Sequence, residues 1–210
     1  MITMSSTAAV SYTHLAQEKD LIVVMPSALN SFYTNWPEVM MGIRVCDYIV
    51  EELMPLVYNW FPASDRPQDN FIAGLSMGAI GTAKFAANYP QRFAAAAAFS
   101  AAPVNLHQSP DTSISENIVT QLKKAHGGIE GAIHSVDNTW DLLVERKKEI
   151  PPMYFTCGTD DPHYPALYLP FKAHALANDL PMTFEEIEGY THEWRFWDKA
   201  IEKAFAFFQL

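Results

Sequence analysis

The chain has 210 residues, a length that suits a single domain with a sizeable buried core. Hydrophobic residues make up 49% of it and charged residues 18%, a composition that excludes an intrinsically disordered chain. The formal net charge of −10, without a long basic run, argues against nucleic acid or an anionic membrane surface as a partner.

The N-terminal residues carry little pattern. Residues 1–10 resemble the start of a common cloning-vector reading frame, and we treat them as a vector-derived or disordered segment. Residues 11–20 suit a short helix. No basic region is followed by an apolar core, so we expect no signal peptide and a cytoplasmic protein. Apolar stretches fall short of the roughly 18 residues that a membrane span needs, so we expect no membrane partner.

The next segment predicts a strand, a loop and a helix. Residues 21–25 form a continuous apolar run that ends at Pro26, which suits a strand buried on both faces. A polar and aromatic loop follows. From residue 37 to about residue 61, apolar side chains recur at three- and four-residue steps, which predicts a helix that Pro55 ends or kinks.

Residues 74–78 read Gly-Leu-Ser-Met-Gly, between a short apolar strand at 70–73 and a good helix former at 79–88. This strand–turn–helix context is what a nucleophile elbow requires. Glycines flank the sharp turn, and the serine sits in a strained conformation that lifts its hydroxyl clear of the sheet. Ser76 is therefore a candidate nucleophile.

The rest of the chain alternates strands and helices. Residues 93–100 contain five consecutive alanines, yet their place in the alternation predicts a strand. Residues 103–150 form an excursion over the site, with helical patches near 116–126 and 139–149. The remaining elements are a strand at 153–157, a helix at 165–178, a strand at 182–187 and a final helix from about 194. Residues 11–210 thus predict one α/β domain with a mostly parallel sheet flanked by helices.

A serine nucleophile needs a base, which is normally a histidine oriented by a carboxylate. In this architecture the carboxylate and the histidine follow the serine, on loops at the carboxyl ends of later strands. Asp160 and Asp161 follow one such strand, and His192 follows the next. We prefer Asp161 as the acid, with a loop-capping aspartate as the alternative, and His192 as the base.

Other histidines and the cysteines suggest no second site. His163 is too near Asp161 to be oriented by it across a separate loop, and it is a candidate pocket residue. Cys46 and Cys157 lack metal-ligand spacing and are expected to be free buried thiols, with a disulfide between them as the alternative. Structural roles are expected for His14, His107, His126, His134 and His174.

Three motifs together resemble the putative-esterase branch of the α/β-hydrolases: 74–78, Cys-Gly-Thr-Asp-Asp-Pro-His-Tyr at 157–164, and Gly-Tyr-Thr-His-Glu-Trp at 189–194. That branch includes tributyrin esterases, S-formylglutathione hydrolases (esterase D), feruloyl esterases and mycolyltransferases. The similarity runs from about residue 12 to the end. It implies the α/β-hydrolase fold, with Ser76 as nucleophile, Asp161 as acid and His192 as base. It also implies that the amide of Met77 is one oxyanion donor.

The chain departs from this family at its start. Family members carry further upstream strands and a His-Gly loop that supplies the second oxyanion amide, so the fold looks N-terminally shortened. A missing donor typically costs ~3–4 kcal/mol of transition-state stabilisation. A backbone amide within residues 27–31 is our candidate replacement. Phe32, Tyr33, Trp36 and Trp194 are candidate pocket residues, and packing is the alternative for the loop aromatics.

A missing strand also leaves unpaired backbone beside the elbow strand. Residues 7–13, the strand at 21–25 or another subunit could fill that slot. We expect the sheet to close up, and the chain to form a homo-oligomer through the altered edge.

These features predict a serine carboxylesterase that acts on short-chain acyl esters, a small-molecule substrate, and needs no metal or organic cofactor. A feruloyl or acetyl-xylan type esterase is the alternative within enzymes. The alternative outside enzymes is that the chain is a truncated, non-catalytic relative that serves as a binding or assembly module.

Overall fold

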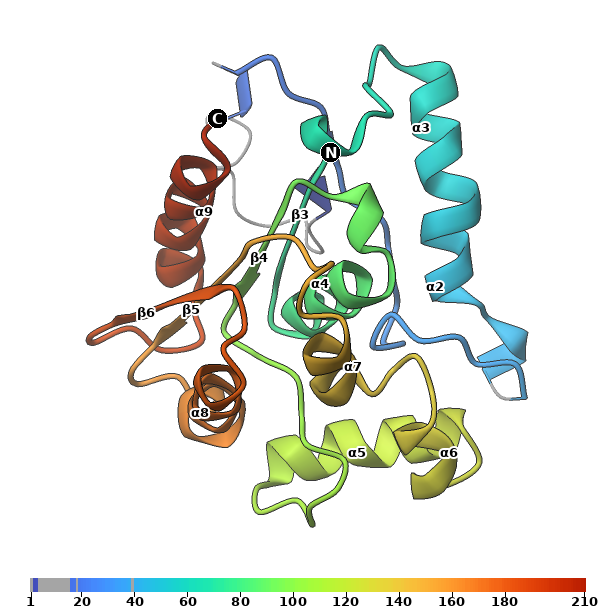
Figure 1. Cartoon of the computed structure of the whole chain (residues 1–210), viewed down its shortest axis with the longest axis vertical. Helices are drawn as coiled ribbons and strands as arrows, with labels where there is room; N and C mark the ends of the chain where they lie inside the picture. The colour runs from blue at the N-terminus through green and yellow to red at the C-terminus, as the bar shows by residue number, and fades with distance from the viewer. Residues whose placement is uncertain (1, 4–15, 18, 39) are drawn as a thin grey trace.

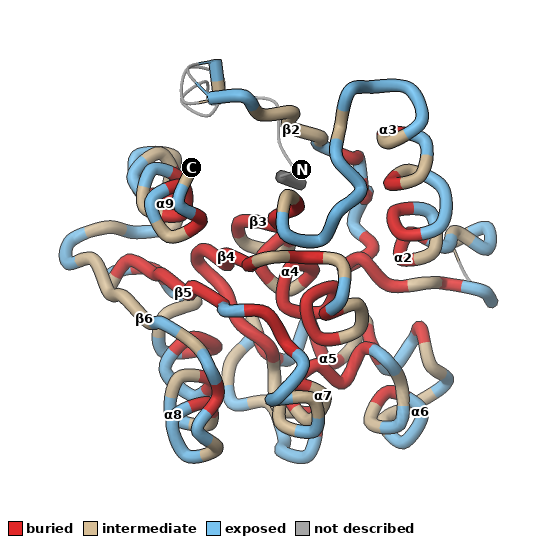
Figure 2. The backbone as a smooth tube through the Cα atoms, turned by 45° about the horizontal axis from the view of Figure 1, so that its top comes forward, coloured by how far each residue is buried: buried red, intermediate tan, exposed pale blue. Residues whose placement is uncertain are grey.

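The computed structural model describes residues 2–3, 16–17, 19–38 and 40–210 (Figure 1). Its centre is a parallel four-stranded sheet in the order β3-β4-β5-β6. The strands are β3 (Phe71–Leu75), β4 (Ala95–Phe99), β5 (Met153–Gly158) and β6 (Met182–Ile187). Every residue of the first three is buried, as expected for strands covered on both faces (Figure 2).

Helices cover both faces of the sheet, and the connecting segments supply several short ones (Figure 1). The α-helices of the described residues are α2 (Val45–Asp47), α3 (Met54–Trp60), α4 (Met77–Asn88), α5 (Ser113–Ala125), α6 (Ile129–Ile133), α7 (Thr139–Glu145), α8 (Leu169–Ala177) and α9 (Trp194–Phe208). π-helical turns span Tyr48–Leu53 and Tyr164–Tyr168, and 3₁₀ turns span Met40–Gly42, Pro67–Asp69 and Pro90–Arg92.

The alanine-rich segment forms a central strand, so the prediction for residues 93–100 is confirmed. Alternate residues of β4 face opposite sides of the sheet: Ala96 and Ala98 pack with α4, whereas Ala95 and Ala97 pack with α9. Small side chains on both faces let these helices approach the sheet closely. Tertiary context therefore overrides the helix propensity of alanine.

The predicted long helix from residue 37 is wrong in its first part and irregular later. An isolated bridge joins Asn35 to Arg44, and helical structure continues only from Val45. In the π-helical turn that follows, the Met54 amide donates to the Ile49 carbonyl, five residues back. Pro55 lies in the first turn of α3 and has no amide proton, so the regular pattern of hydrogen bonds is interrupted there.

Of the three arrangements considered for the vacant slot, direct pairing of the strand at 21–25 with the elbow strand is not observed among the described residues. The observed strand β2 (Val23–Val24) pairs in parallel with β1 (Ile2–Thr3), which itself lies beside β3. The two-stranded β1–β2 sheet therefore lies beside the β3 edge and is separate from the four-stranded sheet. Residues 7–13 lie outside the described part of the chain.

The remaining elements follow the predicted order. The strands at 153–157 and 182–187 and the final helix are confirmed, and the 103–150 segment contains α6 besides the two predicted helices. Cys46 and Cys157 are buried free thiols, as expected. Across the ranges that the structure describes, none of the helices has both the length and the apolar character to cross a membrane.

Helix α4 touches the loop after β2 at Gly81. A Cβ atom on Gly81 would lie 2.5 Å from the Tyr33 ring. Gly81→Ala should therefore lower the free energy of unfolding by about 1–3 kcal/mol through overpacking. In a Tyr33→Ala background the same change should become stabilising by about 1 kcal/mol, because alanine favours the helix. Urea denaturation of the four proteins measures this, and an equal cost in both backgrounds would contradict it.

Candidate active site

Ser76 occupies the sharp turn between β3 and α4. Its backbone has φ 53° and ψ −120°, a left-handed conformation that a non-glycine residue adopts at a cost. A Cβ atom on Gly74 would lie 2.2 Å from the Gly78 carbonyl oxygen, so no other residue fits there without a shift. The Ser76 amide donates to the Phe99 carbonyl at the end of β4, at 2.8 Å. The turn thus holds the hydroxyl at the carboxyl edge of the sheet.

The loops after β5 and β6 bring Asp161 and His192 to the same edge. His192 Nδ1 donates to Asp161 Oδ2 at 2.8 Å, and His192 Nε2 lies 3.0 Å from Ser76 Oγ. Because the carboxylate has no proton to give, Nδ1 carries the hydrogen and the neutral ring accepts at Nε2. Asp160 faces solvent instead. The structure therefore joins the three predicted side chains in one hydrogen-bonded line.

A close contact between the two loops fixes this geometry. A Cβ atom on Gly158 would lie 2.1 Å from the Tyr190 carbonyl oxygen. That same carbonyl accepts a hydrogen bond from the Asp160 amide at 3.0 Å. The loop that carries Asp161 therefore rests directly on the loop that carries His192.

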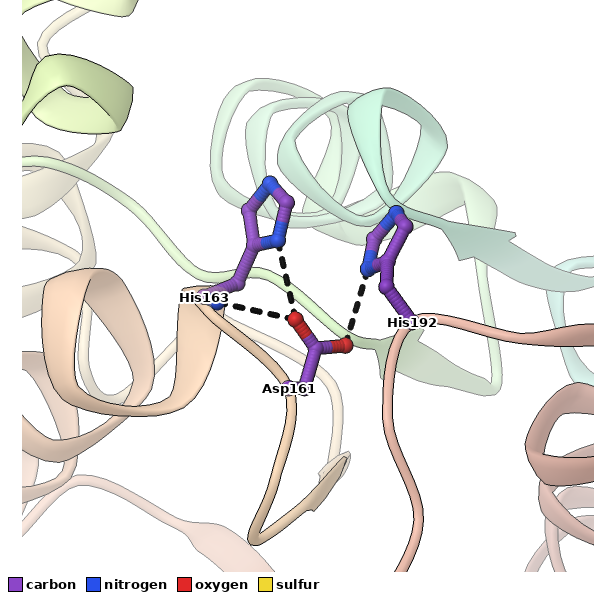
Figure 3. Close-up of side chains that lie close together, drawn as sticks. All are labelled: Asp161, His163 and His192. Carbon is purple, nitrogen blue, oxygen red and sulfur yellow. Dashed lines mark hydrogen bonds and ion pairs between the residues drawn. The ribbon is translucent and has the colours of Figure 1, made fainter.

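Asp161 also orients the ring of His163, although His163 was expected to lie too near Asp161 in the sequence for that. Oδ1 accepts from both the amide and Nδ1 of His163, at 2.8 and 2.9 Å. Figure 3 shows the two imidazole rings on the same side of the Asp161 carboxylate. The rings of His163 and His192 stack, with centroids 4.3 Å apart. Sequence proximity to Asp161 is no obstacle, because the tight turn after Asp161 brings the neighbouring ring back onto the carboxylate.

The environment of Asp161 favours its ionised form. Burial by itself raises the pKa of this carboxyl, but hydrogen bonds from His163 and His192 outweigh it and hold the pKa well below its usual range. The carboxylate therefore stays charged and keeps His192 in the tautomer that can accept a proton from Ser76.

Two residues that the sequence analysis missed support His192 from the other side. The Trp197 ring stands edge-on to His192, with centroids 4.9 Å apart. Its indole N–H donates to Ser100 Oγ at 3.0 Å, and Ser100 has φ 58°. Trp197 lies on the buried face of the predicted final helix, but only the packing of α9 shows which side chain that face covers.

A cavity of about 300 Å³ opens beside Ser76. Of the predicted pocket residues, Phe32 and His163 line it. Tyr33 packs edge-on against Phe85, Trp36 is buried and donates to the Ser31 carbonyl, and Trp194 packs on Trp197; none of them is among the lining residues. The other lining residues are Asn30, Ser76, Met77, Ile80, Ala101, Ser113, Ile114, Asn117 and Ile118.

Helix α5 therefore forms one wall of this cavity. Ile114, Asn117 and Ile118 recur at helical spacing, which is the signal that could have identified them from the sequence. A larger cavity, of about 790 Å³, lies at the amino end of β3 and contains neither Ser76 nor the histidines. The smaller cavity is the candidate site because Ser76 lines it.

The other histidines take no part in this site. His107 pairs with Asp141, His126 pairs with Asp137, and His174 stacks on Trp140. His134 is exposed, and His14 lies outside the described residues. In the described ranges, one group of side chains has the types and spacing of metal ligands, namely Asp161, His163 and His192. A cation held by all three would compete with the hydrogen bonds that already join them.

The lowered pKa of Asp161 predicts a pH dependence of stability. The carboxylate contributes fully above about pH 4, where an unfolded aspartate is ionised. That contribution is lost as the pH falls toward the lower pKa of the folded state, because the unfolded chain takes up its proton first. The stability advantage over Asp161→Asn should therefore shrink between about pH 5 and pH 3. Urea denaturation at constant ionic strength measures it, and a constant advantage would contradict it.

Comparisons with known proteins agree with this geometry. The family model described as putative esterase matches residues 5–208. An acetyl esterase of Caldicellulosiruptor saccharolyticus is 28% identical over 203 residues, which cover 91% of this chain and 73% of that protein. An S-formylglutathione hydrolase of Paracoccus denitrificans is 30% identical over 154 residues, covering 73% of this chain and 51% of that protein.

Solved structures extend the comparison to the fold. The serine hydrolase FphF of Staphylococcus aureus superposes with a TM-score of 0.77 at 29% identity, covering 99% of this chain and 82% of that one. An S-formylglutathione hydrolase of the same organism superposes with a TM-score of 0.74 at 28% identity and the same coverage. This chain therefore belongs to the putative esterase family of the α/β-hydrolases and is a carboxylic ester hydrolase.

Proposed function

We propose that this esterase hydrolyses short-chain acyl esters through an acyl-enzyme intermediate on Ser76. The observation that carries the proposal is the unbroken hydrogen-bonded line from Ser76 through His192 to the buried carboxylate of Asp161. Such a line gives a serine hydroxyl the base that it needs to become a nucleophile.

The reaction follows from these contacts. His192 Nε2 takes the Ser76 proton as Oγ attacks the ester carbonyl, and the resulting imidazolium is stabilised by Asp161. The imidazolium then gives the proton to the leaving alcohol oxygen as the carbon–oxygen bond breaks. A water molecule, deprotonated by His192, attacks the acyl-enzyme and releases the carboxylic acid. No step calls for a metal or organic cofactor.

The oxyanion that forms during attack needs hydrogen-bond donors. Met77 is the first residue of α4, and its amide points from a helix N-terminus, where negative charge is favoured. We infer that the second donor is a backbone amide of the loop after β2, in the segment 27–31. Asn30 and Phe32, which line the cavity with Ser76, support this choice. So do the positive φ angles of Leu29 and Phe32, since strained backbone gathers at functional sites.

The cavity supports small substrates. Its volume of about 300 Å³ is at the lower end for ligand pockets. Phe32, Ile80 and Ile114 provide apolar surface for a short acyl chain, whereas Asn117 and His163 provide polar groups.

A feruloyl or acetyl-xylan type activity remains the alternative within enzymes. The alignment of Ser76, His192 and Asp161 favours catalysis over the alternative of a non-catalytic assembly module. Homo-oligomer formation and a cytoplasmic location stay predictions from the sequence.

Substitutions in the triad test the proposal. Ser76→Ala and His192→Ala should each lower kcat for p-nitrophenyl acetate by at least about 10⁴-fold, because either change removes the nucleophilic step. Ser64→Ala, at an exposed serine far from the cavity, is the matched control and should keep full activity. Full turnover by Ser76→Ala would overturn the proposed function.

Cavity size should set the acyl-chain preference. We expect kcat/KM to be highest for acetyl and butyryl esters and to fall for octanoyl esters. Ile114→Ala should raise the octanoyl-to-acetyl ratio of kcat/KM by roughly 10-fold, since each extra methylene accommodated contributes about 1 kcal/mol or more. Val119→Ala shortens a buried side chain of the same helix that does not line the cavity, and it should leave the ratio unchanged. An equal shift in both variants would contradict the assignment of this wall.

A further inference from the structure

A buried lysine lies on the helix that carries the nucleophile. The Lys84 side chain is 1% exposed. Its ammonium donates to the Phe32 carbonyl at 2.9 Å and to Thr34 Oγ1 at 2.6 Å, and it forms an ion pair with Asp137. Three acceptors thus match the three protons of the ammonium group. Two of these acceptors belong to the loop after β2.

Asp137 balances this buried charge. Its side chain is 2% exposed, and its second oxygen accepts from His126 Nε2 at 2.6 Å. Burial raises the pKa of this carboxyl, but the Lys84 charge and the His126 hydrogen bond outweigh burial and lower it. The group is therefore a complete charged network, which a buried lysine requires.

The loop after β2 needs such an anchor. Leu29, Phe32 and Tyr33 all have φ between 52° and 57°, a backbone conformation that non-glycine residues adopt only at an energetic cost. The Ser31 carbonyl accepts from the Trp36 indole at 3.0 Å, and Ser31 Oγ donates to the Ala28 carbonyl at 2.6 Å. These contacts shape the loop internally. Lys84 and the Tyr33–Gly81 contact tie it to α4.

Ser76 and Lys84 share one rigid element. They are eight residues apart, or about 12 Å along the helix axis. The same helix therefore fixes the nucleophile at its start and the Phe32 carbonyl two turns later. Phe32 in turn lines the cavity beside Ser76. The distance between the loop and the nucleophile is set through α4.

We propose that Lys84 is a positioning residue for ester cleavage. Its buried ammonium holds residues 30–32, which form one wall of the cavity, so that the backbone amides of this segment stay at the distance from Ser76 that ester cleavage requires. Lys84 touches none of the reacting atoms and acts through the loop. The inference rests on the proposed function, since the loop matters for catalysis only if Ser76 attacks an ester.

A purely structural ion pair is the competing explanation, and a double variant separates the two. Buried ion pairs can often be replaced by apolar side chains without loss of stability. Lys84→Met with Asp137→Leu should therefore retain most of the stability, whereas Phe32 and Thr34 still lose their donor. We expect kcat for p-nitrophenyl acetate to fall roughly 10- to 100-fold with KM within about threefold of wild type.

Two further measurements accompany this variant. Hydrogen exchange of peptides that cover residues 28–36 should accelerate, while exchange in the 158–163 loop should stay at the wild-type rate.

Lys172→Met removes a half-buried ion pair with Glu186, away from the cavity, and it should keep the wild-type kcat. Thr34→Val removes one acceptor without changing any charge, and it should lower kcat roughly 3- to 10-fold; it tests the proposal even if the double variant fails to fold.

The outcomes are distinct. A folded double variant or Thr34→Val protein with wild-type kcat overturns the positioning role. A decrease in kcat that Lys172→Met shares also overturns it. If the wild-type protein fails to hydrolyse esters, or if Ser76→Ala retains full activity, the proposed function itself fails, and the positioning role fails with it.

Discussion

The close approach of Gly74 to Gly78 is the constraint on which the rest of the structure depends. Because a Cβ atom on Gly74 would overlap the Gly78 backbone, α4 leaves β3 through a turn that only glycine at position 74 permits without a shift. That turn forces Ser76 into a left-handed conformation, and the Phe99 carbonyl at the end of β4 holds its amide. The direction in which α4 leaves the sheet follows from this turn. Because α4 also carries Gly81 and Lys84, the turn sets the position of the loop after β2 as well.

Parallel strands explain why the other triad residues reach the same place. β5 and β6 run parallel to β3, so the loops that follow them leave the sheet at the edge where Ser76 lies. Asp161 is buried between two imidazoles and an amide, which keep it ionised. Its position then determines the His192 tautomer. A carboxylate that binds two stacked rings also limits its own rotation, because each oxygen has a separate partner (Figure 3).

Among the residues that the structure describes, the buried charged side chains lie in two separate places: Asp161 beside Ser76, and the Lys84–Asp137 ion pair farther along α4. Asp161 binds His163, which lines the cavity, and His192, which lies beside Ser76; in the proposed reaction its charge serves proton transfer. Lys84 and Asp137 are sealed from solvent behind α4, where their charges hold backbone in place. Both are costly unless every hydrogen-bonding group is matched. In each case histidine side chains complete the hydrogen bonding of the aspartate: His126 for Asp137, and His163 and His192 for Asp161.

The sequence by itself determined that Ser76 lies at a strand-to-helix turn and that Asp161 and His192 lie on loops after later strands, because these placements depend on local patterns: G-x-S-x-G after an apolar run, and polar loops after later strands. It also identified the central alanine strand through its place in the alternation. Only the tertiary structure decided that β1 pairs with β2, that His163 shares Asp161, and that Lys84 reaches the Phe32 carbonyl. Those contacts join residues through side-chain directions and helix placement. Both are set by packing across the whole domain, and no short stretch of sequence encodes them.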